Sequence, residues 1–154
     1  MKLKVGRRDH KCAYIPGTNK IVITGGMVGA LFARPYKPGE KTISDFRGSV
    51  FDSTEIIDID SETISMGNPM NLRRHSHGIG HVAINGKDKL VVFGGTDGGG
   101  NNAKALDEIE IYDNETDQWK LSTIRLDKGV RNIECLNIKL GEILESLKSE
   151  QTDQ

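Results

Sequence analysis

An internal repeat is the feature that most constrains how this chain can fold. Three landmarks recur in the same order: an Arg-x-x-His motif, a Gly-Gly pair directly after a short apolar run, and a Glu-Ile-x-Asp run. They begin at Arg7, Gly25 and Glu55 in the first copy, and at Arg74, Gly94 and Glu110 in the second. Self-similarity at a period near 50 residues is typical of repeat architectures, in which each copy is one supersecondary unit.

The two copies differ in the length of one connecting segment. The two Glu landmarks are 55 residues apart, whereas the two Gly-Gly pairs are 69 apart. The segment after the Gly-Gly pair accounts for the difference, because it spans residues 27–54 in the first copy and only 96–109 in the second. An insertion in one loop of a repeated unit explains this without breaking the repeat.

Each copy is predicted to form four short β-strands. "KIVIT" and "KLVVF" are continuous apolar runs of the kind found in strands covered on both faces, and "TEIID" and "EIEIYD" follow as third strands. First strands are expected over 8–15 and 75–84, and fourth strands near 64–67 and 119–124. Eighteen glycines with only four prolines fit many tight turns between strands. The sequence therefore predicts an all-β fold of stacked or radial units.

These landmarks resemble the kelch motif of β-propellers. The second copy, residues 74–124, matches nearly throughout, since a Glu-Ile-Tyr-Asp strand is followed by Glu-Thr and a tryptophan. The first copy, residues 7–70, keeps most landmarks but has Ile57 in place of the tyrosine and Met66 near the tryptophan position. The resemblance implies propeller blades, each a four-stranded antiparallel sheet.

The resemblance also implies structural roles for particular residues. Gly94 and Gly95 would end the second strand at a crowded place that excludes Cβ atoms and suits positive φ. Tyr112 and Trp119 would lie between neighbouring blades as large buried side chains. The Arg74 and His77 side chains would make structural hydrogen bonds within and between blades.

The chain holds fewer blades than a closed propeller, which has about four to eight. We expect a partial propeller over residues 1–138, with motif one at 7–70, motif two at 74–124 and one extra strand at 128–138. A short helix and polar tail are expected over 139–154. Because two blades leave apolar faces uncovered, the chain is expected to self-associate or to pair with further propeller blades.

Composition excludes several classes of partner. The net charge is −1, which is unlike the basic footprint of a nucleic-acid or polybasic membrane protein, so we expect no nucleic-acid partner and no membrane partner. Neither a membrane span nor a signal-peptide pattern is recognisable, and the two cysteines, Cys12 and Cys135, are expected to be reduced. A cytoplasmic location is the expectation.

The chemical motifs favour a scaffold over an enzyme. His75, His77 and His81 fall on alternate positions of the predicted strand 75–84, so a shared face is conceivable, but no nearby carboxylate or cysteine completes a metal site. "GGTDGGGNN" lacks the Gly-Lys-Ser/Thr ending of a phosphate-binding loop. No Ser-His-Asp order suggests itself. We therefore expect no catalytic residues, no cofactor and no metal.

The long loops are the predicted partner-binding elements, because propeller strands are committed to packing. The loop within 27–54 and the shorter loop 96–107 carry residue types that are enriched at interaction hot spots or can form polar contacts. The predicted binding residues are Phe32, Arg34, Tyr36, Phe46, Arg47, Asp97 and Asn101. A tolerated surface insertion remains the alternative for the longer loop.

Two function classes remain open at this point. The kelch resemblance implies a non-enzymatic protein-interaction module, a scaffold or adaptor of the ubiquitin-ligase adaptor or cytoskeletal type. The alternative is a fragment of a carbohydrate-active or copper-oxidase-type propeller enzyme, which would need a central cluster of tyrosine, histidine and arginine from several blades.

Overall fold

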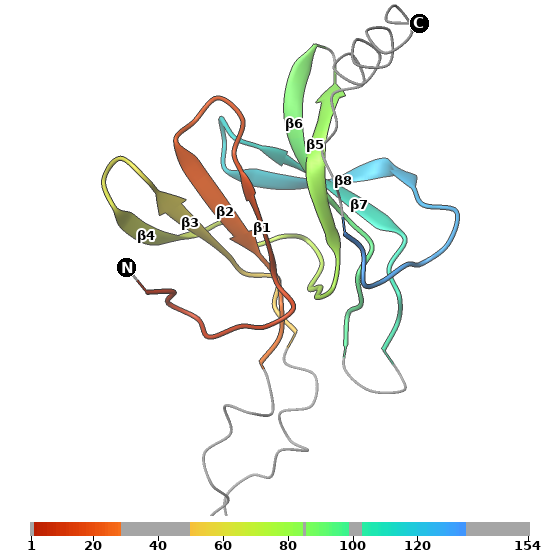
Figure 1. Cartoon of the computed structure of the whole chain (residues 1–154). Coiled ribbons are helices and arrows are strands. Elements are labelled where there is room, and N and C mark those ends of the chain that lie inside the picture. Colours follow the sequence, from red (N-terminus) through yellow and green to blue (C-terminus); the bar gives the residue numbers. More distant parts are fainter. Residues whose placement is uncertain (1, 29–49, 85, 99–102, 135–154) are drawn as a thin grey trace, which may run out of the picture.

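The described part of the chain consists of two four-stranded antiparallel sheets (Figure 1). This computed structural model describes residues 2–28, 50–84, 86–98 and 103–134. The first sheet, called blade 1, contains β1 (Lys11–Tyr14), β2 (Lys20–Thr24), β3 (Thr54–Asp58) and β4 (Thr63–Gly67). The second, called blade 2, contains β5 (Gly78–Ile84), β6 (Lys87–Phe93), β7 (Glu108–Asp113) and β8 (Gln118–Arg125). The all-β prediction is confirmed, and the described residues contain no helix.

Strands follow one another in space in the order of the sequence in both blades. The turn between the first two strands contains a glycine with positive φ, Gly17 at 73° in blade 1 and Gly86 at 72° in blade 2. The turn between the last two strands ends on a non-glycine residue in the left-handed region, Glu62 at 53° and Asp117 at 51°. The two blades therefore repeat the same turn geometry, as the sequence repeat predicts.

The first strand of each blade begins later than predicted. Strands were expected from residues 8 and 75, but β1 begins at Lys11 and β5 at Gly78. Asp9 and Ser76, both at φ 53°, interrupt the extended backbone just before each strand. The residues in front of them, Arg8 and His75, still form isolated β-bridges, with Met27 and Thr96 respectively.

The main hydrophobic core lies between the two blades. Blade 1 and the segment after it contribute Ile15, Val22 and Met70, and blade 2 contributes Ile79, Leu90, Val92, Tyr112 and Trp119. The rings of Tyr112 and Trp119 lie 4.9 Å apart between centroids, and the Tyr112 hydroxyl donates to Asp117 at 2.8 Å. The prediction that these two aromatic residues lie between the blades is confirmed.

The register of the strands corrects one predicted equivalence. Trp119 pairs with Tyr112, and the corresponding pair in blade 1 is Ile64 with Ile57. Ile64, and not Met66, therefore occupies the tryptophan position of the first copy. The error arose because the sequence shows no residue resembling tryptophan there, whereas the register follows from the matching length of the two turns.

The predicted extra strand is also wrong in the part that the structure describes. From 126 to 134 the backbone forms no strand, although it makes hydrogen bonds to blade 2 that are described below. The rest of the expected strand, and the helix and tail expected over 139–154, lie outside the described residues. In the described part, no helix is long and apolar enough to cross a membrane.

We expect the substitution Trp119→Ala to lower the free energy of unfolding by about 3–5 kcal/mol, because it removes a large buried ring from the core between the blades. Leu121→Ala is the matched control on the same strand, since Leu121 is half-exposed and its truncation costs about 1 kcal/mol or less. Urea denaturation followed by circular dichroism measures both. Equal stability of the two variants would contradict the assignment of Trp119 to the core.

Candidate partner-binding rim

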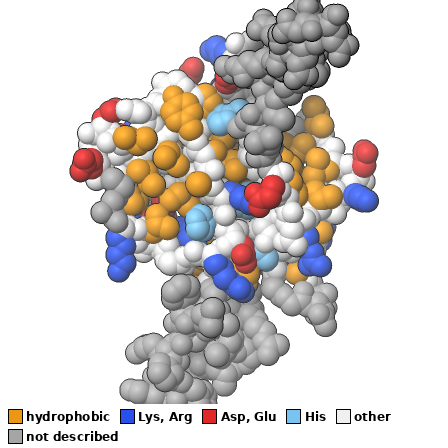
Figure 2. Space-filling model, in the orientation of Figure 1, with side chains coloured by type: hydrophobic (Ala, Val, Ile, Leu, Met, Phe, Trp, Pro, Cys, Tyr) orange, Lys and Arg blue, Asp and Glu red, His pale blue; other side chains and the backbone are white. Residues whose placement is uncertain are grey.

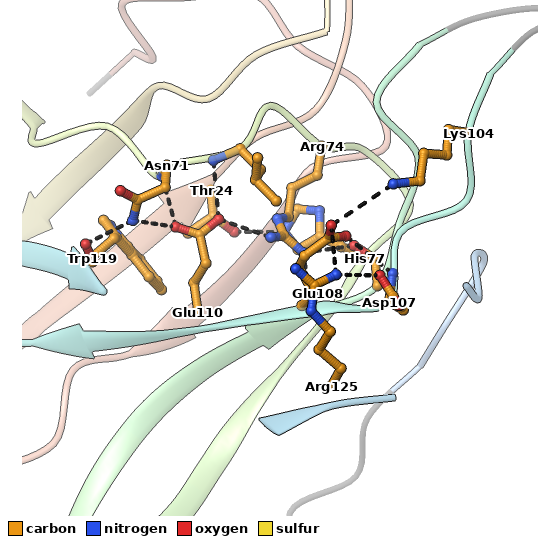
Figure 3. A network of polar contacts seen from close by, with 12 residues as sticks. Thr24, Asn71, Arg74, His77, Lys104, Asp107, Glu108, Glu110, Trp119 and Arg125 are labelled. Carbon is orange, nitrogen blue, oxygen red and sulfur yellow. Dashed lines mark hydrogen bonds and ion pairs between the residues drawn. The ribbon is translucent and has the colours of Figure 1, made fainter. Parts of the chain in front are cut away.

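A buried ion pair joins the start of each blade to its third strand. In blade 2 the Arg74 and Glu110 side chains are fully buried and lie 2.8 Å apart (Figure 3). The Arg74 guanidinium also donates to the carbonyl oxygens of Gly94 at 2.7 Å and Glu108 at 3.2 Å. Arg7 does the same in blade 1, where its partners are Glu55, Gly25 and Ser53. The predicted structural role of Arg74 is confirmed.

Each buried glutamate also accepts hydrogen bonds from the backbone that leads into its blade. The Glu110 carboxylate accepts from the N–H groups of Asn71 at 2.6 Å and Leu72 at 3.1 Å. Glu55 accepts in the same way from Lys4 and Val5. Because buried charges are costly unless paired and hydrogen-bonded, these bonds explain how a carboxylate can occupy a strand interior. In the sequence Glu55 and Glu110 are recognisable only as strand landmarks, and this role was not predicted.

Each Gly-Gly pair lies against two backbone segments, the one that leads into its own blade and the one that follows that blade. All four glycines have positive φ, between 57° and 93°. Gly26 donates its N–H to the Arg74 carbonyl at 2.9 Å, and a Cβ at Gly95 would lie only 2.7 Å from the His75 carbonyl. Another residue type would face both steric overlap and backbone strain there. The predicted reason for the glycines is confirmed.

His77 connects the two blades. Its Nε2 atom lies 2.8 Å from the Thr24 hydroxyl at the end of β2, and both side chains are buried. Burial, and then the positive charge of Arg74, lower the pKa of His77 to about 3. The imidazole is therefore neutral in the folded protein at neutral pH. The predicted bond of His77 between blades is confirmed.

The long loops begin and end at isolated β-bridges. Met27 pairs with Val50, and Thr96 pairs with Ala105. The backbone that leads into each blade, called the lead-in backbone, adds a third partner to each bridge. Arg8 pairs with Met27, and His75 pairs with Thr96. These bridges fasten segments 28–49 and 97–104 at both ends, and the described backbone that carries the bridges lies at the same edge of the molecule for both segments (Figure 1). We call this edge the rim.

Asp97 holds the shorter rim loop closed. Its carboxylate accepts the N–H of Lys104 at 3.0 Å, and its own N–H donates to the Lys104 carbonyl at 3.2 Å. The His75 ring lies 3.0 Å from the carbonyl oxygen of Gly98 in the same loop. Asp97 is the one predicted binding residue within the described part. Phe32, Arg34, Tyr36, Phe46, Arg47 and Asn101 lie outside it, so their roles stay predictions.

A cluster of charges lies beside the shorter loop. Arg125 lies 3.0 Å from both Asp107 and Glu108, and Lys104 lies 3.8 Å from Glu108 (Figure 3). Burial alone would raise the pKa of Glu108, but backbone hydrogen bonding and the Arg125 guanidinium hold it below its usual value. This cluster was not predicted from the sequence. The charges come from the end of β8, the start of β7 and the segment before β7, so the sequence shows no local charge motif.

The three histidines considered as metal ligands do not share a face. Since β5 begins at Gly78, His75 and His77 precede the strand, and the interpretation of one shared strand is wrong. His75 contacts Gly98 and His77 contacts Thr24, whereas His81 has its Nε2 atom 2.8 Å from the Tyr14 carbonyl. Among the residues that the structure describes, no group of three or more potential ligands could hold a metal ion.

Comparison with known proteins identifies the second copy of the repeat. Residues 77–122 match the kelch motif, and this range contains all of β5 and β6, all of β7 and most of β8. No curated protein matches the chain. The predicted resemblance to kelch repeats is therefore confirmed. Blade 1 lies outside the matched range but repeats the strand order, the buried ion pair and the glycine geometry of blade 2.

We expect acid to destabilise the protein partly through His77. Because the pKa of His77 is near 3 when folded and near its ordinary 6.5 when unfolded, only the unfolded state gains the proton between these values. The contribution of the neutral His77 side chain to the free energy of unfolding is fully present above about pH 6.5. It decreases as the pH falls, by about 2 kcal/mol at pH 5. His77→Asn, which does not titrate, should lose less stability between pH 7 and pH 5. Denaturation curves of both proteins at pH 7 and pH 5 measure this. An equal loss of stability in the unaltered chain and in His77→Asn would contradict the expectation.

Proposed function

We propose that this kelch-repeat protein is a non-enzymatic module that binds another protein through its rim. The observation that carries the proposal is the pair of long segments, 28–49 and 97–104, each fastened at its base by β-bridges. A rigid base lets a loop present its side chains without the cost of ordering its ends. Loops held by a rigid scaffold are where binding residues concentrate.

The strands offer much less to a partner at this edge. The motif residues Arg74, His77 and Trp119 are buried in contacts within and between the blades. The longer rim segment, 28–49, in contrast, contains aromatic and arginine residues, which are the types that dominate binding energy at protein interfaces. Phe32, Arg34, Tyr36, Phe46 and Arg47 in the longer segment, with Asp97 and Asn101 in the shorter one, form the proposed contact set.

The class of partner is proposed from the kelch repeat alone. Kelch modules commonly mediate protein–protein interaction, which supports a scaffold or adaptor of the ubiquitin-ligase or cytoskeletal type in the cytoplasm. The alternative, a fragment of a carbohydrate-active or copper-oxidase-type enzyme, requires a cluster of tyrosine, histidine and arginine open to a substrate. In the described residues Tyr112 donates to Asp117 and is buried, and Arg74 and His77 are held in internal contacts. No observation favours the enzyme.

We expect the triple substitution Arg34→Ala, Tyr36→Ala and Phe46→Ala to reduce capture of the partner by at least about tenfold, because hot-spot truncations each cost about 1 kcal/mol or more. The melting temperature should change little. Affinity capture from cell extract, quantified by mass spectrometry against the unaltered chain, measures the loss. The control is Lys87→Ala with Glu115→Ala, two exposed charges at the end of the blade where β6 begins and β7 turns into β8.

Two outcomes would contradict the proposal. One is that the triple variant captures the same proteins as the unaltered chain. The other is that the control variant loses them equally, which would place the binding surface at the turns and not at the rim.

We also expect the purified protein to hold no stoichiometric copper or zinc, because its histidines contact separate backbone and side-chain groups. Metal analysis by inductively coupled plasma mass spectrometry, with and without prior chelator treatment, measures this. A metal bound in a one-to-one ratio, together with a lower melting temperature after chelation, would favour the enzyme alternative.

A further inference from the structure

Blade 2 has a second face, turned away from blade 1, that we call the far face. Side chains alternate between the two faces of a strand, so the register of the blade defines its members. The face with Leu90 and Trp119 forms the core with blade 1. Figure 2 shows hydrophobic side chains gathered where Figure 1 places β7 and β8. The central members of the far face are apolar: Val82 on β5, Val91 and Phe93 on β6, and Ile109 and Ile111 on β7.

The far face is only partly covered by the rest of the described chain. In blade 1 the corresponding face packs against blade 2, and its Thr24 and Thr54 side chains are 0% and 1% exposed. Phe93 and Ile109 occupy the same two places in blade 2, but they are only partly buried. Val82, at the other end of the far face, is 48% exposed. The far face therefore has apolar area left for an occupant.

The residue types on the far face favour an apolar occupant. In blade 1 the Thr24 hydroxyl lies 2.8 Å from the His77 ring, and the Thr54 hydroxyl donates to the Asn68 carbonyl at 2.9 Å. Both bonds join blade 1 to the backbone that leads into blade 2. The phenylalanine and isoleucine at these places in blade 2 have no polar group for such a bond. The far face thus presents larger apolar side chains in place of two hydroxyls.

The backbone that follows blade 2 has also lost the arginine of a lead-in. Residues 126–133 cross blade 2 as residues 70–77 cross blade 1. The N–H of Val130 donates to the Leu106 carbonyl at 3.1 Å, which is the bond that the Arg74 N–H makes to blade 1. Val130 therefore takes the place of Arg74, and it brings no guanidinium that would pair with a glutamate of a further blade.

The place of His77 in this segment is taken by Ile133. A Cβ atom at Gly25 would lie 3.1 Å from the His77 ring, and a Cβ at the equivalent Gly94 would lie 2.7 Å from Cδ1 of Ile133. Since Gly94 directly follows Phe93, the isoleucine side chain lies at the end of the far face. It extends the apolar surface there, where blade 1 has a polar contact.

The chain leaves its described part beside the far face. Ile133 lies against Gly94, and Glu134 is the last described residue. The Glu134 carboxylate lies 2.6 Å from the ammonium group of Lys11, which holds this point of the chain near the first strands of both blades. Another 20 residues, 135–154, follow.

These residues carry an apolar stripe in the helix that the sequence predicts over 139–154. Its members lie at positions i, i+3, i+4 and i+7, the spacing that places side chains on one face of a helix. Most of the stability of such a helix comes from packing its stripe, so the stripe needs a surface. Its members are Leu140, Ile143, Leu144 and Leu147.

The length of this segment matches the width of the far face. The distance from β5 to β8 is three strand spacings, or about 14 Å. A helix of ten residues has a length of about 15 Å, so residues 140–149 are long enough to cross all four strands. The short connection 135–139 also keeps the stripe near the face, at an effective concentration on the order of millimolar. A second copy of the chain would compete only at a comparable concentration.

We infer that the far face of blade 2 is the docking surface for the chain's own C-terminal segment, whose apolar stripe packs on Phe93, Ile109 and Ile111. The segment closes this end of the pair of blades from within the chain. The far face is then not available to a further blade or to a second copy.

Paramagnetic broadening of methyl signals tests the inference in the full chain. Ser149→Cys carries a nitroxide, because residue 149 lies on the side of the predicted helix opposite the stripe. Cys12→Ser and Cys135→Ser remove the two natural thiols, so that the nitroxide has a single position. The isoleucine methyl groups are isotope-labelled, and their intensities are compared before and after reduction of the nitroxide.

The far face and the opposite end of the molecule should respond differently. We expect the methyl signals of Ile109 and Ile111 to lose most of their intensity while the nitroxide is oxidised. The signals of Ile57 and Ile64 should keep theirs, because these side chains lie on the face of blade 1 that is turned away from blade 2.

Three variants provide the controls. Leu144→Asp with Leu147→Asp places charges in the stripe, and should restore the intensity of the far-face signals. Val82→Asp places a charge on the far face itself, and should restore the intensity in part. Met66→Asp is its match on blade 1, since both side chains are 48% exposed, and should leave the broadening unchanged.

Three outcomes would overturn the inference. The first is full intensity of the Ile109 and Ile111 signals in the nitroxide-labelled chain. The second is equal broadening in the variant with Leu144→Asp and Leu147→Asp, which would show that the tether alone brings the nitroxide near. The third comes from a mixture in which some chains carry the nitroxide and others carry the labelled methyl groups. Broadening in this mixture would identify a second copy as the occupant.

Discussion

The ion pair between Arg74 and Glu110 is the contact on which the rest of blade 2 depends, as that between Arg7 and Glu55 is for blade 1. Removing one partner would leave a buried charge uncompensated, which commonly costs about 3–5 kcal/mol. The pair joins three parts of the blade that are distant in sequence: the lead-in backbone, the carbonyl of the Gly-Gly pair and the third strand. It therefore specifies how the chain enters each sheet, in addition to any stability that it contributes.

This arrangement separates the parts of the protein that pack from those that can bind. The lead-in backbone and the glycines are fully engaged on one side of each sheet, which leaves the loops beyond the β-bridges free to vary in sequence and length. A partner at the rim would be recognised by loop side chains.

Most of the fold could be predicted from the sequence because the same landmark residues occur in both copies of the repeat. The glycines, Trp119 and Arg74 take the places that the kelch resemblance implies. The equivalence of Ile64 with Trp119 could not be predicted from the sequence, because it depends on the register between the third and fourth strands and not on residue type. The hydrogen bonds between Asp97 and Lys104 and the charge cluster at Glu108 could not be predicted either, since their partners are brought together only by folding. The remaining rim residues stay predictions.

The β-bridges at the base of the rim segments have a consequence for how this fold can diversify. The longer segment, 28–49, has nearly three times as many residues as 97–104, yet both close on the same kind of bridge. Loop-closure entropy grows only with the logarithm of length, so the difference costs about 1 kcal/mol for flexible segments. The two positions can therefore accept foreign sequences of very different lengths at little thermodynamic cost. In an engineering setting, they are natural places to graft a recognition peptide onto an unchanged β-scaffold.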